Sequence, residues 1–288
     1  MVKVQNAVKN YKNFHLKCSM EALPGRVTGI VGQNGAGKST LFKLILGLIS
    51  LDGGAIEILE TDSRKFKKPD KQKIGVVLPD SGFSEYFTIK DMIPILDSFY
   101  DRFQKERFLE LCERFALPLN KQTKEFSTGM KTKLKIIIAT THDASLLILD
   151  EPTVGMDVIA RGECFEILRE FMEAREENAI LISSHISSDL EGICDELYMI
   201  HGGEIIFHED VDALLGEYGI LKVDAEQYEK LDKTYLLKVK QETYGYRCLT
   251  GQRQFYLENY PEIAIEKGNI DELIVLMILS QGSQGTER

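Results

Sequence analysis

The stretch that decides the fold is GQNGAGKST at residues 32–40, which follows the apolar run at residues 27–31. It matches the phosphate-loop pattern GxxxxGK[ST]. Apolar residues recur at helical spacing over residues 41–48, so the pattern stands between a strand and a helix, as this motif requires. Its glycines let successive backbone N–H groups point inward at phosphate oxygens, and the start of the helix adds the positive end of its dipole. The stretch therefore predicts a phosphate-binding loop in an α/β fold of the P-loop NTPase type.

Two side chains of this loop have a clear chemical purpose. The Lys38 ammonium would reach the β- and γ-phosphates of a nucleoside triphosphate, and the Ser39 hydroxyl would ligate Mg²⁺. ATP and Mg²⁺ are therefore the predicted cofactors. The residues of the loop expected to bind the nucleotide are Gly32, Asn34, Gly35, Ala36, Gly37, Lys38, Ser39 and Thr40.

A second part of the site is predicted where the apolar run at residues 146–149 ends in two carboxylates, Asp150 and Glu151. In open α/β sheets, ligands bind at the carboxyl ends of the strands, so these acids should face the same crevice as the phosphate loop. Asp150 is suited to holding Mg²⁺, and Glu151 is suited to accepting a proton from the attacking water. Glu151 and Lys38 are therefore predicted to be catalytic residues of an ATPase.

His185 is the third candidate catalytic residue. It follows Ser183 and Ser184 at the end of the apolar run at residues 179–182 and should reach the same sheet edge. From there its imidazole could hydrogen-bond the γ-phosphate and position the attacking water. The remaining histidines lack this context, and we expect structural roles for them: His15, His142, His201 and His208.

The wider pattern predicts a central, mainly parallel sheet. Short runs rich in Val, Ile and Leu have the continuous apolar character of strands that are covered on both faces. These predicted strands are residues 27–31, 74–78, 146–149 and 179–182.

Three further segments complete the predicted organisation. Residues 88–141 are mainly helical and predict an insertion between two strands, and a hairpin is expected around Gly202 and Gly203. The character of the sequence then changes, with more tyrosine and an alternating apolar pattern. We therefore predict a nucleotide-binding domain over residues 1–215 and a small C-terminal α+β module of unknown role over residues 216–288.

Composition narrows the class of protein. The formal net charge of −10 argues against sequence-independent binding to nucleic acid, because contacts from Lys and Arg to phosphate dominate such binding. The five cysteines are widely spaced and form no CxxC pair, as is usual in a reducing compartment. The start of the chain lacks the apolar stretch of a signal peptide, and no uncharged apolar segment approaches the roughly 18 residues of a membrane span. We therefore expect a cytosolic location.

The segment FSTGMK at residues 126–131 completes a family pattern. The order of phosphate loop, helical insertion, strand ending in Asp-Glu-Pro-Thr, and Ser-His resembles the nucleotide-binding subunit of ATP-binding-cassette (ABC) transporters, over about residues 2–210. The segment stands in the place of the family's LSGGQ signature, in which Ser127 and Gly129 match and two other positions differ from the commonest form. The form S-x-G-M-K resembles subunits that pair with separately encoded membrane proteins, often bacterial exporters.

The resemblance implies a site completed by a second subunit, with an antiparallel β part at the N-terminus of the fold. In the family, the residues matched by Ser127 and Gly129 contact the γ-phosphate held by the other subunit, so the two would bind nucleotide in trans. Residues 154–157 match the segment that lies across this interface, and Tyr11 matches the aromatic residue that stacks on adenine. The implied partners are a second ABC subunit, in a homodimer or heterodimer, and a separately encoded transmembrane permease. Such a partner would hold the chain at the inner face of the cell membrane.

One position departs from the family pattern. Aligning residues 74–76 and 88–89 with the flanking pattern puts Pro79 where a Gln usually contacts Mg²⁺ and water. Proline has no side-chain donor or acceptor. The neighbouring carboxylate, Asp80, could take over the metal contact; alternatively, this loop only transmits motion.

These features favour an ATP-binding and ATP-hydrolysing subunit of an ABC transporter. It would dimerise around two ATP–Mg²⁺ and drive a separate membrane-spanning subunit, with export as the expected direction. The alternative is a soluble ABC-type ATPase that acts on ribosomes, DNA or cluster assembly. A nucleotide-gated interaction module without turnover is a third class, against which Glu151 argues.

Overall fold

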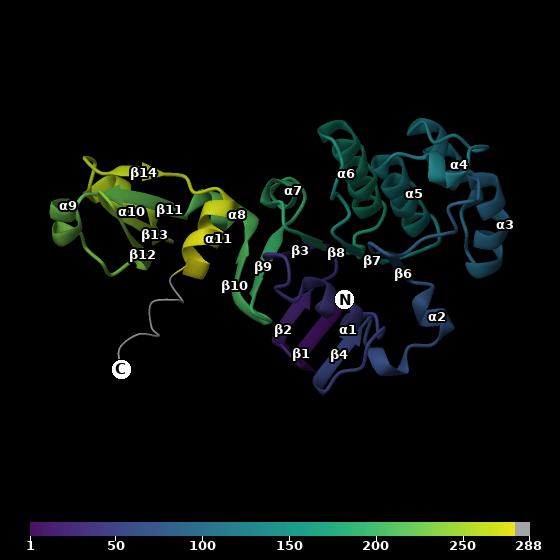
Figure 1. The fold of residues 1–288 in the computed structure, drawn as a ribbon, viewed down its shortest axis with the longest axis horizontal. Coiled ribbons are helices and arrows are strands. Elements are labelled where there is room, and N and C mark those ends of the chain that lie inside the picture. Colours follow the sequence, from purple (N-terminus) through teal and green to yellow (C-terminus); the bar gives the residue numbers. More distant parts are fainter. Residues whose placement is uncertain (280–288) are drawn as a thin grey trace. The chain divides into compact units, whose positions relative to one another are not determined.

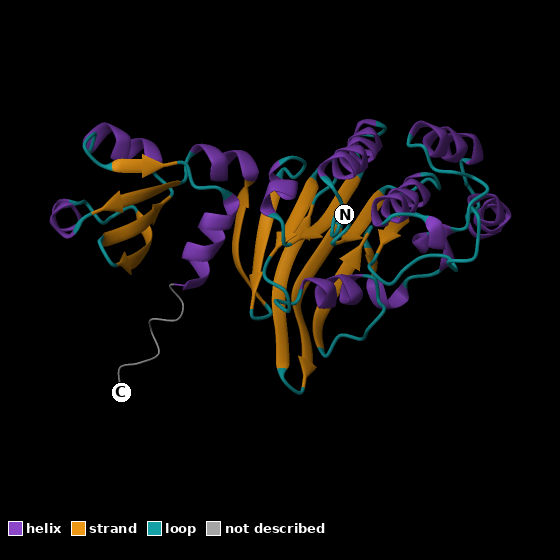
Figure 2. Cartoon of the chain, turned by 45° about the horizontal axis from the view of Figure 1, so that its top comes forward, coloured by secondary structure: helices purple, strands orange, loops and turns teal. Residues whose placement is uncertain are grey.

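The computed structural model describes residues 1–279 of the 288-residue chain. The chain divides into two compact units, Met1–Phe207 and His208–Arg288, whereas we expected the second domain to begin at residue 216. Figure 1 follows the chain through its elements, and Figure 2 distinguishes strands from helices.

The central sheet contains the predicted apolar strands. Its strands are β3 (Val27–Val31), β6 (Ile74–Val77), β7 (Leu146–Asp150), β8 (Ala179–Ser184), β9 (Glu196–His201) and β10 (Glu204–Asp210). They run in the order β10-β9-β3-β8-β7-β6, and β3 pairs in parallel with both β8 and β9. β7 likewise pairs in parallel with β6 and β8. Every residue of β3, β7 and β8 is buried, which confirms the prediction of strands covered on both faces.

An antiparallel sheet forms the N-terminal β part. Its strands are β1 (Val2–Tyr11), β2 (Phe14–Ala22), β4 (Gly53–Ile58) and β5 (Thr61–Asp62), in the order β2-β1-β4-β5. Buried and exposed residues alternate along β2, so one face of this sheet packs into the core. Leu16, Phe42 and Ile56 are fully buried in that core.

Helices lie on both sides of the central sheet. The longer ones are α1 (Lys38–Ile45), α3 (Ile89–Phe99), α4 (Lys105–Arg114), α5 (Thr128–Thr140) and α6 (Val158–Glu173). Shorter ones are η1 (Ser63–Lys65), α2 (Lys68–Lys71), η2 (Thr123–Glu125) and α7 (Ser187–Glu191). α1 lies on the side of the antiparallel sheet, whereas α5 and α6 lie on the other side (Figure 1). The expected helical insertion corresponds to α3, α4 and α5.

The end of α1 differs from the helical spacing in the sequence. The helix ends at Ile45, and Gly47 then has a φ of +64°, a left-handed conformation that suits glycine. Leu48, which the spacing put on the apolar face of this helix, lies beyond it and is 58% exposed. The prediction for Leu48 was therefore wrong.

The second unit has its own sheet and core. Its strands are β11 (Gly219–Val223), β12 (Leu236–Glu242), β13 (Gly245–Thr250) and β14 (Ala264–Glu266), in the order β12-β13-β11-β14. Its helices are α8 (Val211–Gly216), α9 (Ala225–Lys230), α10 (Arg253–Asn259) and α11 (Ile270–Leu279). Leu221, Cys248 and Tyr256 are fully buried in the core of this unit.

Two global expectations can be compared with the described residues. The five cysteines are free and buried, and burial raises the pKa of the Cys18 thiol to about 12. Within residues 1–279, no helix is both long enough and apolar enough to cross a membrane.

Candidate active site

The phosphate loop connects β3 to α1, and its glycines shape it. Gly35 and Gly37 have φ values of +81° and +118°, which residues with a side chain rarely adopt. A Cβ on Gly32 would come within 2.3 Å of the Ile200 carbonyl oxygen, so a side chain there does not fit. Lys38 Nζ donates to the carbonyl oxygen of Gly32 at 2.6 Å. The loop is therefore compact, with its lysine folded along it.

Glu151 joins the three segments predicted to meet at this sheet edge. Its Oε1 lies 3.0 Å from Lys38 Nζ at the start of α1. Its Oε2 lies 2.6 Å from Nδ1 of His185, which follows β8, and also accepts from the His185 backbone N–H at 3.2 Å. Lys38 is 6% exposed, so its ion pair with Glu151 is largely shielded from water. The structure therefore brings the three predicted catalytic side chains into contact.

The backbone of Glu151 is in the left-handed region. Its φ is +50°, which costs a residue other than glycine on the order of 1–3 kcal/mol and persists only where the surroundings hold it. Ser183 supplies part of that hold: the Glu151 N–H donates to Ser183 Oγ at 3.0 Å and lies 3.2 Å from the Ser183 carbonyl oxygen. The strained backbone conformation is therefore anchored to the neighbouring strand.

Asp150 ends β7 and is almost fully buried. Ser183 Oγ donates to its Oδ1 at 2.6 Å, which orients the carboxylate. Asp150 and Ser39 both line the same cavity. A carboxylate and a hydroxyl are hard oxygen ligands of the kind that Mg²⁺ prefers, so these two residues fit the predicted metal.

These side chains surround a cavity of about 790 Å³. Besides the phosphate loop and the residues above, its walls include Pro152 and Val154, which follow β7, and Thr128 of α5. Within the described chain, the residues predicted to bind nucleotide that line the cavity are Asn34, Gly35, Gly37, Lys38, Ser39 and Thr40.

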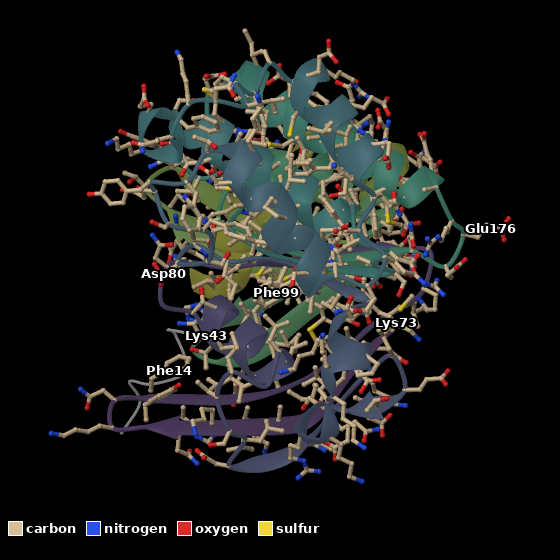
Figure 3. All side chains as sticks on the ribbon, turned by 90° about the vertical axis from the view of Figure 1, so that its right-hand side faces the viewer. Phe14, Lys43, Lys73, Asp80, Phe99 and Glu176 are labelled. Carbon is tan, nitrogen blue, oxygen red and sulfur yellow. The ribbon has the colours of Figure 1, made fainter. Side chains whose placement is uncertain are left out.

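Phe14, at the start of β2, contributes a phenyl ring to the wall of this cavity. A Cβ placed on Gly37 would lie 3.0 Å from Phe14 Cζ, so the ring packs against the phosphate loop. Tyr11, at the end of β1, is 49% exposed, and its ring centroid lies 6.5 Å from that of Phe14. Figure 3 places Phe14 on the N-terminal sheet. The role of Tyr11 in stacking on adenine stays a prediction.

Ser127 and Gly129 lie at the start of α5. Ser127 is the N-cap of that helix and accepts from the Met130 N–H at 3.2 Å. A Cβ on Gly129 would lie 2.9 Å from the Cβ of Ala160, so close packing of α5 and α6 requires glycine there. Neither residue is among those that line the cavity in the described chain. Their role in trans stays a prediction.

Pro79 and Asp80 follow β6 and line a second cavity of about 310 Å³ on the side of the helical insertion. Figure 3 shows Asp80 on this loop. Lys135 of α5 lines both cavities, and its Nζ donates to the carbonyl oxygens of Leu78 and Pro79 at 3.2 and 3.1 Å. Burial lowers the pKa of Lys135, and Asp80 opposes that shift. The metal contact of Asp80 stays a prediction.

Several residues of the site were not predicted to contribute, and Ser183, Phe14 and Lys135 are the most informative of them. Ser183 stands in the Ser-Ser-His segment, but its sequence does not reveal that its hydroxyl joins Asp150 to Glu151. Phe14 and Lys135 reach the cavity from segments distant in sequence. For Ser183, its position two residues before the predicted catalytic residue His185 could have indicated a place in the site.

The fold and the site together define a P-loop ATPase. A family model described as ABC transporter matches residues 16–154. The ABC transporter ATP-binding protein NatA of Bacillus subtilis (strain 168) is 33% identical over 223 residues, which cover 75% of this chain and 86% of NatA. The chain belongs to the family of ABC transporter ATP-binding proteins and, as a member, is an ATP-binding and ATP-hydrolysing subunit. This confirms the family inferred from the motifs.

Other relatives and solved structures agree. The bacitracin transport ATP-binding protein BcrA of Bacillus licheniformis is 36% identical over 185 residues, covering 63% of this chain and 60% of BcrA. The solved structure of an ATP-binding subunit of an ABC transporter has a TM-score of 0.67 and 25% identity, covering 74% of this chain and 91% of that one. A dimeric ATP-binding cassette bound to ADP and Pi has a TM-score of 0.65 at 20% identity, covering 73% and 99%. At 20% identity, the comparison with the dimeric cassette shows similarity of fold alone. Together these structures confirm the predicted fold class.

Proposed function

We propose that the cavity binds ATP as its Mg²⁺ complex. Ser39 and Asp150 hold the metal, Lys38 contacts the β- and γ-phosphates, and backbone N–H groups of the phosphate loop bind other phosphate oxygens. When bound, Mg²⁺ neutralises charge on the phosphates. The side chains that line the cavity support this proposal, because they include a hydroxyl and a carboxylate suited to the metal and an ammonium suited to phosphate.

In this proposal Glu151 is the general base. Water attacks the γ-phosphorus, its proton passes to a Glu151 oxygen, and the bond to the bridging β–γ oxygen breaks to release ADP and phosphate. His185 orients Glu151 and reaches the water or the γ-phosphate from the same wall of the cavity. The observation that carries the proposal is the 2.6 Å contact between Glu151 Oε2 and His185 Nδ1, with Lys38 on the other carboxylate oxygen.

A second ABC subunit completes each site in this proposal. Ser127 and Gly129, at the start of α5, contribute to the ATP held by the partner. Apolar side chains near these two residues are exposed in the single chain: Val154, Val158 and Ile159 are 43%, 81% and 78% exposed. Exposed apolar patches often mark protein–protein contacts, so this surface supports the proposed interface with a partner subunit. The dimeric form of a solved cassette of the same fold is consistent with this arrangement.

The work of hydrolysis is passed to a separately encoded transmembrane permease in this proposal. The second cavity borders the Pro79 loop and the helical insertion, so it offers a docking place next to the nucleotide. Relatives are named for lantibiotic transport in Streptococcus pyogenes and for Nod factor export in Rhizobium etli, and the second of these names favours export. The chain then works in the cytoplasm at the inner face of the cell membrane.

The Glu151→Gln variant tests the catalytic part. The amide cannot accept the proton, so steady-state ATP hydrolysis should fall about 10²- to 10⁴-fold while ATP still binds. With ATP and Mg²⁺, the variant should accumulate as a dimer in size-exclusion chromatography. Glu177→Gln, on the exposed surface, is the control and should keep wild-type turnover. Unchanged turnover in Glu151→Gln would remove Glu151 from this role.

The partner is tested by searching the neighbouring genes for a polytopic membrane protein and producing any such protein together with this chain. Phe83 lines the second cavity, so Phe83→Ala should reduce the fraction of the chain that sediments with membranes. Its ATPase activity without the partner should stay unchanged. Equal sedimentation of the variant and the wild type would argue against docking at this cavity.

A further inference from the structure

A buried carboxylate connects three segments next to the active site. Asp189 on α7 is 2% exposed, and its Oδ2 accepts from Thr153 Oγ1 at 2.5 Å. Its Oδ1 accepts from Arg161 Nη1 of α6 at 2.8 Å. Arg161 Nη2 also lies 3.5 Å from the Met156 carbonyl oxygen. The carboxylate therefore links the segment after β7, the start of α6, and α7.

These links form a ring that includes the catalytic pair. Thr153 follows Glu151 by two residues, and Asp189 follows His185 by four. The same two segments are thus joined twice, once by the Glu151–His185 contact at 2.6 Å and once by the Thr153–Asp189 contact at 2.5 Å. Because both segments are short, a change of spacing at one contact is transmitted to the other.

The ring also explains how the conformation of Glu151 persists. Its left-handed φ of +50° requires neighbours that hold the chain on both sides. Ser183 holds the N–H of Glu151 from one side. Thr153, which is 1% exposed and bonded to Asp189, holds the chain two residues further on.

Arg161 extends the ring toward the surface. A buried carboxylate needs a charged or hydrogen-bonding partner, and Arg161 supplies the positive charge for Asp189. The guanidinium also reaches Met156, in the loop that carries the exposed residues Val154 and Asp157. A displacement of residues 154–157 therefore acts on Arg161 and, through it, on Asp189.

We propose that Asp189 is a positioning residue for ATP hydrolysis. Through Thr153 it keeps Glu151 and His185 at their contact distance, and through Arg161 it makes that contact depend on the placement of residues 154–157. Asp189 is not among the residues that line the nucleotide cavity of the described chain, so its effect passes through Glu151. The inference rests on the proposed role of Glu151 as general base.

The chain provides a matched control for the experiment. Thr28 on β3 is also fully buried, and its hydroxyl donates to Glu196 Oε1 at 2.8 Å. Glu196 is 3% exposed, and Arg26 Nη1 lies 3.5 Å from its Oε2. Thr28→Val and Thr153→Val therefore each remove a threonine hydroxyl that donates to a buried carboxylate, and each carboxylate also lies next to an arginine. Only the second group adjoins the catalytic pair.

The test compares ATPase kinetics, ATP affinity and thermal melting of these variants. A small displacement of a catalytic group costs about tenfold to a hundredfold in rate, so Thr153→Val should lower kcat by that factor and leave KM nearly unchanged. Thr28→Val should melt at a similarly reduced temperature but keep the wild-type kcat. Thr153→Ser, which restores the hydroxyl, should recover kcat.

A double variant separates this inference from the proposed function. If Asp189 acts through Glu151, Thr153→Val should lower kcat in the wild type and add no further loss to Glu151→Gln. Equal kcat values in Thr153→Val and Thr28→Val would overturn the role of Asp189 while leaving that of Glu151 intact. A further loss in the double variant would show that Thr153 acts by another route. Full turnover in Glu151→Gln itself would instead overturn the proposed function.

Discussion

Replacing Ser183 with alanine should reveal how strongly the two carboxylate residues depend on one hydroxyl. This hydroxyl is fully buried, donates to Asp150 Oδ1 at 2.6 Å and accepts from the Glu151 N–H at 3.0 Å. Alanine keeps the Ser183 carbonyl oxygen, which lies 3.2 Å from the same N–H. The loss therefore falls mainly on Asp150, whose carboxylate loses a donor in a place with little access to water.

The charge of Asp150 sets the expected magnitude. A hydrogen bond to a charged group contributes about 1.5–3 kcal/mol, so the free energy of unfolding of Ser183→Ala should fall by about that amount. For a domain of this size, each kcal/mol lowers Tm by about 2–4 °C, which gives a decrease of about 3–12 °C. Mg²⁺ with a nucleotide should restore part of the lost stability if the cation binds Asp150.

The assay is a double-mutant cycle followed by thermal melting, with Ser183→Ala, Asp150→Asn and the double variant. Asparagine removes the charge, so the hydroxyl should then contribute only about 0.5–1.5 kcal/mol, and the coupling energy should be about 1 kcal/mol. Ser184→Ala is the control for the loss of a buried serine hydroxyl. The Ser184 hydroxyl is as buried as that of Ser183, but it accepts from the Ile186 N–H and not from the Glu151 N–H. A coupling energy below about 0.5 kcal/mol, the scatter of independent sites, would refute the reasoning.

Three further predictions concern the aromatic wall, a buried histidine and the Pro79 loop. Phe14→Ala should weaken ATP binding about twofold to tenfold, because an aromatic contact contributes about 0.5–1.5 kcal/mol, and it should leave tripolyphosphate binding unchanged. Calorimetric titration should show a smaller effect for Tyr11→Ala, and the opposite order would identify Tyr11 as the adenine platform. Burial lowers the pKa of His142 below its ordinary 6.5, so the unfolded chain takes up a proton first as the pH falls, and the free energy of unfolding should decrease below about pH 6.5. His142→Phe can keep the stacking on Tyr100 and should flatten the slope of Tm against pH in this range; an unchanged slope would exclude His142 as its source. If Asp80 contacts Mg²⁺, Asp80→Ala should raise the Mg²⁺ concentration for half-maximal ATPase activity by about tenfold or more. Unchanged Mg²⁺ dependence and turnover would assign Asp80 to the second cavity alone.

The parts of the site that the sequence predicted are those specified by local patterns. The phosphate loop depends on glycines whose φ values no other residue tolerates well, and these are written consecutively in the chain. Asp150 and His185 follow apolar runs, and parallel strands bring their carboxyl ends to one edge of the sheet. The order of motifs was therefore enough to predict which side chains meet at this edge.

The contacts that the sequence did not reveal join residues far apart in the chain. Whether Tyr11 or Phe14 faces the nucleotide depends on the geometry of the turn between β1 and β2, since the two residues are direct cross-strand partners. The bond between Ser183 and Asp150 requires the register that pairs those two residues in β7 and β8. Such register is a property of the packed sheet, so a pattern of residue types does not report it.

The ion pair between Lys38 and Glu151 connects the proposed general base to the residue proposed to bind phosphate. Phosphate oxygens and the Glu151 carboxylate are anionic ligands for the same ammonium, which also donates to the Gly32 carbonyl oxygen at 2.6 Å. An ammonium has only three N–H groups, so contacts with the β- and γ-phosphates compete with its contact to Oε1. We therefore expect phosphate binding at Lys38 to release one oxygen of Glu151, while His185 keeps its contact with the other. In the proposed mechanism, the contacts that position the Glu151 carboxylate would therefore depend on the presence of the nucleotide.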